Sequence, residues 1–450
     1  MRLVLYTLLI LLYIINQFLF QPTLDYATGV IAVLALGISA VYARGLYRVS
    51  GFVFLLLGLL LFFWNGLVWH SIFLHFQTML GLLSFFLVLP FIHSLIRVGR
   101  YDKNLSQFLQ DRVTAMPALY KRSSLVCHFL GIFLNIAAIP LLTRSLEPSL
   151  QMLPKRDTDK FFSNSLLRSY ALCLMWSPME VLVSLTVDFT QTPYYWLLPI
   201  IVFNVLAVLL IDWALSGFRY KNISIPLAKE SRSKSAHVSK KMLHLLGMLL
   251  VFVLLVSLVQ HIVERGFLFS VVLLLIPFSF LWAAASRKAK SYLALAAPYW
   301  KQRTNGLADF FFMFLSAGLF VDMLSLSGLL SFLEPVFLAA AQTPFVLYLL
   351  IAGYFLLTSF IGLHSLVSLT FLLQFLLPVL PEVAGMPLAI VIITCALSPV
   401  MYSPFNLSVS MLTSELRISP YRIAGWNVGF AILCMLFGIL VSALLEQTIY

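Results

Sequence analysis

Long apolar runs alternate with short polar segments along the whole chain. Apolar runs of about 18 residues or more are typical of helices that cross a hydrocarbon core about 30 Å thick. The pattern therefore predicts an all-α polytopic membrane protein with about eleven transmembrane helices. The predicted helices cover residues 3–20, 27–43, 51–69, 71–96, 123–144, 194–215, 243–262, 266–285, 306–332, 343–375 and 423–446.

Two further apolar stretches, residues 165–187 and 386–412, are interrupted near the middle by proline and small polar residues. Neither half of either stretch is long enough to span a bilayer as an ordinary helix. We therefore expect each stretch to form a broken or re-entrant hairpin that enters and leaves on one face of the membrane. The alternative is that the prolines only kink ordinary helices.

The two interrupted stretches share a motif. The first reads MWSPMEVLVS from Met175, the second reads MYSPFNLSVS from Met401, and a Pro-Tyr pair follows each, at Pro193 and Pro420. A helix precedes and follows both stretches, and the charge pattern places them in opposite membrane orientations. The sequence therefore predicts an inverted repeat, as in many secondary transporters.

Composition excludes a soluble fold, because 61% of the 450 residues are hydrophobic and only 10% are charged, against about 25% in soluble domains. The net charge of +12 lies in the segments between apolar runs, which indicates membrane topology and no nucleic-acid partner. Residues 44–50, 97–122, 217–242 and 286–304 are basic and predicted to be cytoplasmic. Only residues 145–164, with Lys155, Arg156 and Lys160, would be basic and outside.

These observations divide the chain into five predicted parts. Residues 1–96 form N-terminal helices, either a scaffold or a homodimer contact. The others are the first repeat unit 123–215 with hairpin 165–187, the basic cytoplasmic loop 216–242, the connecting helices 243–305, and the second repeat unit 306–446 with hairpin 386–412.

Interrupted helices in a membrane need polar partners for their freed backbone groups, from side chains or from a bound solute. The candidate substrate-binding residues lie at such interruptions. They are Asn135, Ser177, Ser184, His364, Ser365, Ser403, Asn406 and Ser408. Two of them have a structural alternative: Asn135 as a hydrogen-bonding contact between helices, and His364 as an interior histidine or a proton shuttle.

Acidic residues inside membrane segments are rare and usually functional. Glu180 follows the Pro178 interruption among apolar neighbours, so we expect it to couple transport to a proton or another cation. Asp188, Asp212 and Asp322 are expected at the membrane interface. The four cysteines lie in apolar stretches without metal-ligand spacing, so no metal or cofactor is expected.

At these motifs the chain resembles the ion transporter superfamily, which includes divalent-anion and dicarboxylate symporters, arsenite permeases and large subunits of tripartite dicarboxylate transporters. The resemblance covers residues 123–446. It implies substrate and coupling-ion binding at hairpin tips, with matching positions Ser177 to Glu180 and Ser403 to Asn406. The tips depart from the Ser-Asn-Thr tripeptide of the dicarboxylate symporters, since they read SPME and SPFN.

The function expected from the sequence is secondary active transport of a small anionic organic solute across the cytoplasmic membrane, coupled to protons or sodium. The alternative is a membrane-embedded enzyme or an assembly subunit acting on a lipid-linked substrate. The sequence contains no HExxH, DxxD or Gly-x-Ser-x-Gly motif and no Walker motif. We therefore expect no catalytic residues and no direct use of ATP.

Overall fold

The fold is all-helical. The structure is a computed structural model that describes residues 1–100, 109, 115–151, 153–221, 223, 235–329, 331–383 and 385–449, with the backbone alone for 235–242, 382 and 449. Every secondary-structure element in this part of the chain is a helix, and twelve of its segments are long and apolar enough to cross a membrane. The predicted polytopic all-α class is confirmed. Residues 224–234 of the predicted basic loop lie outside the described residues.

The chain forms two compact units, residues 1–98 with 259–337 and residues 99–258 with 338–450. The chain passes between them three times, after Val98, within α12 (Ser235–Val263) and within α16 (Glu334–Ala341). The first unit contains α1 (Arg2–Leu19), α2 (Pro22–Tyr42), α3 (Gly45–Trp64), η1 (Trp69–Phe76), α4 (Leu80–Val98), α13 (Phe267–Ala285), α14 (Ala289–Asn305) and α15 (Ala308–Leu326). Helix α14 lies in the segment predicted as a basic connection.

Helix α15 packs against α2 and α3 of the first unit. Two glycines of α3 permit this close packing, because a Cβ atom at Gly51 would lie 2.5 Å from the Phe312 ring and one at Gly58 would lie 3.0 Å from Leu319. Small residues at helix contacts are a common device of membrane proteins. The sequence assigned residues 306–332 to the second repeat unit, whereas α15 belongs to this first compact unit.

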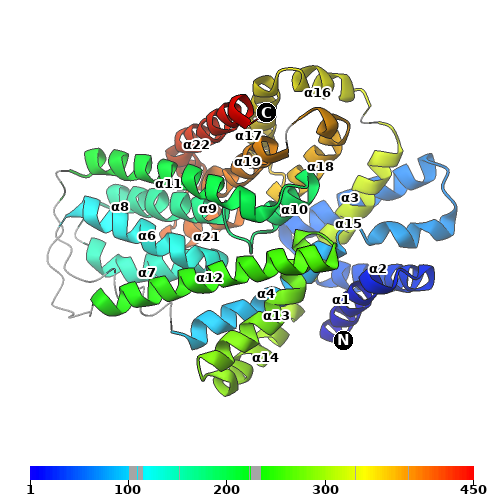
Figure 1. The fold of residues 1–450 in the computed structure, drawn as a ribbon, viewed down its shortest axis with the longest axis horizontal. Coiled ribbons are helices and arrows are strands. Elements are labelled where there is room, and N and C mark those ends of the chain that lie inside the picture. The colour runs from blue at the N-terminus through cyan, green and yellow to red at the C-terminus, as the bar shows by residue number, and fades with distance from the viewer. Residues whose placement is uncertain are drawn as a thin grey trace. The chain divides into compact units, whose positions relative to one another are not determined.

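The second compact unit contains two runs of helices, which are coloured cyan to green and yellow to red in Figure 1. The first run is α6 (Met116–Leu134), η2 (Asn135–Ala137), α7 (Ala138–Leu150), α8 (Lys155–Phe162), η3 (Ser163–Leu167), α9 (Arg168–Leu174), α10 (Val181–Thr190) and α11 (Tyr194–Arg219). The second run is α17 (Pro344–Ile361), α18 (Ser365–Leu376), η4 (Leu377–Glu382), α19 (Gly385–Leu397), α20 (Pro399–Tyr402), α21 (Leu407–Leu416) and α22 (Pro420–Ile449).

Helices α6 and α7 fold back on each other at Asn135. The two outer ends of the pair both lie beside α8: the Tyr120 ring is 5.7 Å from that of Phe161, and the Thr158 hydroxyl donates to the Leu150 carbonyl at 3.4 Å. A continuous helix over these residues would carry its ends far apart, since each residue adds 1.5 Å. The pair therefore forms a helical hairpin.

Helices α17 and α18 form a second hairpin, around Gly362. The Tyr354 hydroxyl donates to the Ser368 carbonyl at 2.8 Å. These residues are 14 positions apart, about 21 Å along a straight helix, so the chain must turn back between them. The sequence predicted one membrane-crossing segment over 343–375, interrupted near Gly362, whereas the structure shows a hairpin at that interruption.

The two interrupted stretches, by contrast, run on beyond their interruptions. Helices α8, α9 and α10 follow one another from left to right in Figure 1, and α10 packs against α18 and α19 instead of beside α9. The geometry thus corrects the prediction that residues 165–187 and 386–412 are hairpins. The hairpins are formed by residues 116–150 and 344–376, each of which precedes an interrupted stretch in the sequence.

The two interrupted helices lie antiparallel to each other. The end of α10 meets the start of α19, because a Cβ atom at Gly385 would lie 2.7 Å from the Thr190 carbonyl oxygen. The start of α8 meets the end of α21, where Asp159 and Glu415 line one cavity. Between these ends, α9 packs against α20. We call residues 155–190 and 385–416 the crossing pair.

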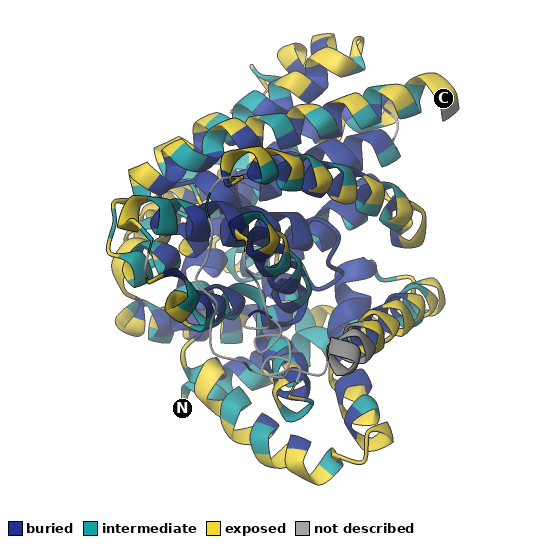
Figure 2. Cartoon of the chain, turned by 90° about the vertical axis from the view of Figure 1, so that its left-hand side faces the viewer, coloured by how far each residue is buried: buried dark blue, intermediate teal, exposed yellow. Residues whose placement is uncertain are grey.

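The crossing pair is the most buried part of the second unit. All residues from Phe161 to Met179 and from Pro387 to Pro404 are buried, whereas most long helices show the stripes of buried and exposed residues visible in Figure 2. A helix that is apolar and buried on all sides must be enclosed by other helices. The surrounding hairpins and helices α11 and α22 provide this enclosure.

Candidate functional site

The first interruption lies between α9 and α10 and is a tight turn. Pro178 has no amide hydrogen, and the Glu180 amide donates to the Ser177 carbonyl at 3.1 Å, which closes the turn. Glu180 then caps α10: its side chain accepts a long hydrogen bond of 3.5 Å from the Leu182 amide. An acceptor at this position satisfies one of the free amides of a helix start.

The second interruption, between α20 and α21, repeats this geometry. The Asn406 amide donates to the Ser403 carbonyl at 3.0 Å, and the Asn406 side chain accepts from the Ser408 amide at 3.1 Å. The shared Ser-Pro motif therefore folds into the same turn twice. A carboxylate occupies the capping position in one turn and a neutral amide in the other.

The two hairpin tips each end a helix at a residue with positive φ, but only Gly362 adopts the left-handed helical conformation. Asn135 ends α6 with φ 52° and its amide donates to the Gly131 carbonyl, while Gly362 ends α17 with φ 97° and its amide donates to the Thr358 carbonyl. A positive φ is easy for glycine and tolerated by asparagine. The Asn135 side chain accepts from the Tyr170 hydroxyl and from the following amide.

Each hairpin contacts the interrupted helix that follows it in sequence. The Trp176 indole donates to Nε2 of His128 on α6 at 2.8 Å. At the other end, the Ser403 hydroxyl donates to the Ser359 carbonyl on α17 at 2.8 Å. The Phe405 ring covers Gly362, where a Cβ atom would lie 3.3 Å from it.

Accessible surface appears at the interruptions, within otherwise buried helices. The buried stretch that begins at Phe161 ends at Glu180, which is partly exposed. The stretch that begins at Pro387 ends at Phe405, which is exposed. The tip residues 135–137 and 362–364 are also partly or fully accessible. Four helices begin at these points, namely α7, α10, α18 and α21, and helix starts carry free amides and a partial positive charge.

The other predicted site residues support the interruptions. Ser184 is buried on α10 and donates to the Glu180 carbonyl at 3.2 Å. Ser408 is buried and donates to the Val400 carbonyl. His364 caps α18 by accepting from the Leu366 amide at 3.3 Å, and Ser365 follows it as a buried residue.

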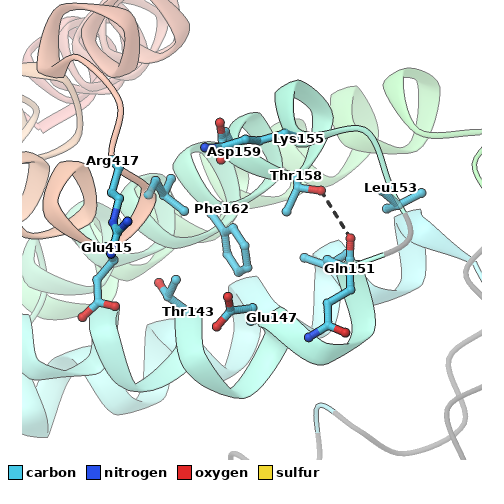
Figure 3. Close-up of a pocket in the computed structure, with 12 residues that line it drawn as sticks. Thr143, Glu147, Gln151, Leu153, Lys155, Thr158, Asp159, Phe162, Glu415 and Arg417 are labelled. Atoms are coloured by element: carbon cyan, nitrogen blue, oxygen red, sulfur yellow. Dashed lines mark hydrogen bonds between the residues drawn. The ribbon is translucent and has the colours of Figure 1, made fainter.

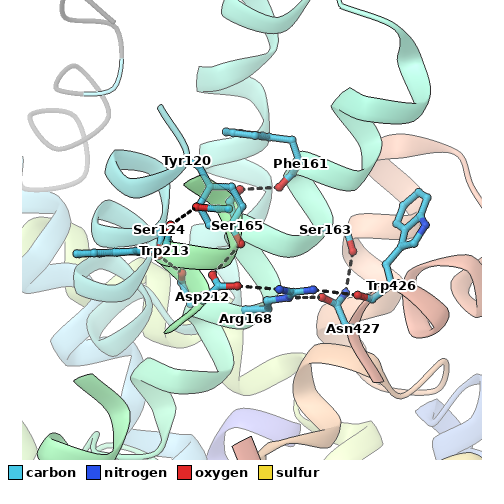
Figure 4. A network of polar contacts seen from close by, with 12 residues as sticks. Tyr120, Ser124, Phe161, Ser163, Ser165, Arg168, Asp212, Trp213, Trp426 and Asn427 are labelled. Atoms are coloured by element: carbon cyan, nitrogen blue, oxygen red, sulfur yellow. Dashed lines mark hydrogen bonds and ion pairs between the residues drawn. The ribbon is translucent and has the colours of Figure 1, made fainter. Parts of the chain in front are cut away.

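An ion pair near the interruptions was not predicted from the sequence. Arg168 of α9 and Asp212 of α11 are 2.7 Å apart, with 5% and 1% of their side chains exposed (Figure 4). Arg168 also donates to the Asn427 side chain and to the Trp426 carbonyl on α22, each at 2.9 Å. One guanidinium therefore links α9, α11 and α22.

Asp212, which was expected at the membrane interface, is buried and paired in the structure. It also accepts from the Tyr120 hydroxyl at 2.7 Å, so α6 joins the same network.

The signal in the sequence was Arg168 itself, a lone cation in an apolar stretch, because such a residue requires a partner. At the end of α11, burial raises the pKa of Tyr220 to about 12, so its hydroxyl stays protonated.

The second run has a different contact where this ion pair would lie. Thr394 and Gly438 follow Arg168 and Asp212 by 226 positions each, and a Cβ atom at Gly438 would lie 2.9 Å from the Thr394 side chain. The last helix thus contacts the crossing pair directly there. No ion pair is needed where a glycine allows van der Waals packing.

A cavity of about 310 Å³ lies at the end of the crossing pair, between α7, α8 and the end of α21 (Figure 3). Its lining includes acidic, basic and hydroxyl side chains. Arg144 and Glu415 form an exposed ion pair of 2.8 Å at its edge. Among the described residues, no group of three or more His, Cys, Asp and Glu side chains could hold a metal ion.

Comparison with known proteins gave no match, either to a protein-family model or to a curated protein sequence.

Proposed function

We propose that the chain is a secondary active transporter of the ion transporter superfamily type, which moves a small anionic organic solute across the cytoplasmic membrane coupled to protons or sodium. The observation that carries this proposal is the crossing pair. Two antiparallel helices are interrupted by the same turn, and unsatisfied backbone at membrane depth persists only where it lines a cavity or is buried in protein.

The proposed architecture is an inverted repeat of α6–α11 and α17–α22. Five landmarks recur at a spacing of 226 or 227 positions: the tips Asn135 and Gly362, the turns at Ser177 and Ser403, the caps Glu180 and Asn406, the left-handed helix ends Gln191 and Arg417, and Pro193 and Pro420 before the last helices. Such a constant spacing supports duplication of one structural unit.

The packing between the two runs is reciprocal. Helix α10 of the first run packs against α18 of the second, and the matching helix α21 packs against α7. Likewise, α11 packs against α19, and α22 packs against η3. Each of these contacts has a counterpart in which the two runs have swapped roles. Such paired contacts are typical of two units related by a two-fold axis.

The hairpins at 116–150 and 344–376 also improve the charge assignment. If α6–α7 enters and leaves on the cytoplasmic side, residues 145–164 with Lys155, Arg156 and Lys160 are cytoplasmic, as the positive-inside rule requires. The segment that opposed the predicted topology then agrees with it. When the membrane crossings are counted along the chain in this way, α17–α18 enters from the outside. The two units then have opposite orientations, as in an inverted repeat.

The proposed solute site lies at the four interruptions. The starts of α7, α10, α18 and α21 would point free amides at the solute, which favours a carboxylate or another anion. Asn135, Ser177, His364, Ser403 and Asn406 supply side-chain hydrogen bonds, and the buried serines 184, 365 and 408 hold the turns. Glu180, the acidic cap, is proposed to bind the coupling proton or sodium ion.

Gradient-driven uptake in proteoliposomes tests the proposal. A panel of labelled organic anions is offered under an imposed proton or sodium gradient, first to the full chain and then to Glu180→Gln and Asn406→Ala. We expect Glu180→Gln to remove the dependence on the gradient and Asn406→Ala to weaken solute binding by about tenfold, as for loss of a hydrogen bond to a charged group.

Asp188→Asn is the matched control, because Asp188 lies on the same helix α10 at the end away from the interruption. It is expected to retain coupled uptake. If both site variants transport the same solute with unchanged coupling, the interruptions are not the transport site. If no anion is taken up under either gradient, the transporter proposal itself is contradicted.

A further inference from the structure

The cavity at the end of the crossing pair contains a buried carboxylate that has no partner. The Asp159 residue is 5% exposed, it lines the cavity, and among the described residues its side chain makes no hydrogen bond or ion pair. Burying an unpaired charge costs several kcal/mol. A cation that enters the cavity would therefore stabilise this carboxylate.

The other charged groups of the cavity do not supply that cation. Glu415 already accepts from Arg144 at 2.8 Å, so this arginine is engaged elsewhere. Lys155 and Arg417 lie at the rim and are exposed. Lys155 and Arg422 interact electrostatically with Asp159, but among the described residues neither forms an ion pair with it. The floor is thus negative, while the rim carries both signs.

The neutral groups on the floor also present acceptors. The Thr143 hydroxyl donates to the Ile139 carbonyl at 2.9 Å and the Thr158 hydroxyl donates to the Leu150 carbonyl at 3.4 Å. A hydroxyl has one hydrogen to donate, so both oxygens offer only lone pairs to the cavity. Phe162 adds an aromatic ring to the lining, which favours a cation over an anion.

We propose that this cavity is a binding site for a small monovalent cation, with the charge against the Asp159 carboxylate and the Thr143 and Thr158 hydroxyls around it. A single buried carboxylate neutralises a single positive charge. A volume of about 310 Å³ holds a hydrated alkali ion or a small organic ammonium compound. The site is separate from the four interruptions, and its occupancy is independent of whether the chain transports an anion.

Binding to the full chain in detergent tests this site directly. The thermal unfolding midpoint is followed while sodium chloride, potassium chloride or methylammonium chloride replaces tetraethylammonium chloride at constant ionic strength. Tetraethylammonium has no N–H or O–H group, and its four ethyl groups keep its charge away from the Asp159 carboxylate. A ligand that binds only the folded chain raises the midpoint in a saturable way, and we expect this for at least one of the three cations.

Asp159→Asn is expected to weaken that binding by about tenfold or more, because it removes the charged partner. The matched control is Asp157→Asn, an acid on the same helix that does not line the cavity, and it should bind like the unchanged chain. Thr143→Val keeps every charge and should weaken binding by several-fold, so it tests the site even if Asp159→Asn does not fold.

The three cations identify the source of the charge: saturation by methylammonium alone indicates an organic ammonium ligand, and saturation by sodium or potassium indicates an alkali ion. The proposal is overturned if none of them shifts the midpoint beyond tetraethylammonium, or if Asp159→Asn and Thr143→Val respond like the unchanged chain. Because no gradient or uptake is involved, this result is read separately from the transport assay.

Discussion

The α6–α11 and α17–α22 segments share one path but are held together by different chemistry. In the first, Arg168 and Asp212 join the crossing pair to α11 through a buried ion pair. In the second, Thr394 and Gly438 occupy the matching positions and touch directly. If the two segments are a repeat, as proposed, a close link between the crossing helix and the last helix is formed by charge in one and by small side chains in the other.

The two links differ in what breaks them. A buried ion pair fails when one partner is removed, because the other becomes an unpaired charge. A close contact of small residues fails when bulk is added. Substitutions at the two positions therefore test whether the segments are equivalent in architecture and distinct in chemistry.

The largest loss of folding stability is expected for Arg168→Met. It leaves Asp212 buried without its partner, which typically costs about 3 to 5 kcal/mol. The measurement is the unfolding midpoint of the purified full chain, followed by tryptophan fluorescence. The double substitution Arg168→Met with Asp212→Leu should recover much of the loss, because it removes both charges.

Arg144→Met is the control for this prediction. Arg144 also forms an ion pair, with Glu415, but its side chain is 73% exposed, and exposed pairs contribute only about 0 to 1 kcal/mol. Equal shifts for Arg168→Met and Arg144→Met would show that burial of the first pair has no energetic consequence.

A smaller effect is expected for Gly438→Ala in the second segment. The added methyl group would lie 2.9 Å from Thr394, and overpacking of this kind costs about 1 to 3 kcal/mol. Gly429→Ala on the same helix α22 is the control, because it meets nothing within 4 Å. The same midpoint assay reports both, and a destabilised control with an unchanged Gly438→Ala would refute the close contact.

The smallest effect concerns the hairpin tips. Gly362→Ala must keep φ near 97°, which costs about 1 to 2 kcal/mol for a residue with a Cβ atom, and its methyl group must also displace the Phe405 ring. Gly353→Ala lies in open space on the same helix and should be neutral or stabilising. If Gly362→Ala unfolds at the unchanged midpoint, the tip does not constrain α17 and α18.

Much of the fold followed from the sequence because apolar length is a strong signal. The all-α class and most span boundaries agree with the structure within a few residues, as for residues 266–285 and α13. The Ser-Pro motif located both interruptions. Sequence could not say whether the chain turns back at an interruption, because that depends on partners far along the chain.

The hairpins were therefore assigned to the wrong segments for a physical reason. Pro178 and Pro404 mark breaks plainly, whereas the α6–α7 tip depends on Asn135 adopting a positive φ and the α17–α18 tip on Gly362. The basic segment 145–164 was the signal that opposed the assignment. The Arg168 network and the Asp159 cavity were missed because each brings together residues from separate helices.

The antiparallel crossing pair also sets an order of events during synthesis. Residues 161–179 are buried partly by α19 and α20, which include residues 387–404, and these helices are made more than 200 residues later. At about 5 to 20 residues per second, the ribosome needs roughly 10 to 45 s to supply them. During that time the segment that contains Arg168 must be kept away from lipid by α6 and α11 or by the insertion machinery. The packing of the first half is therefore completed only after the second half has been made.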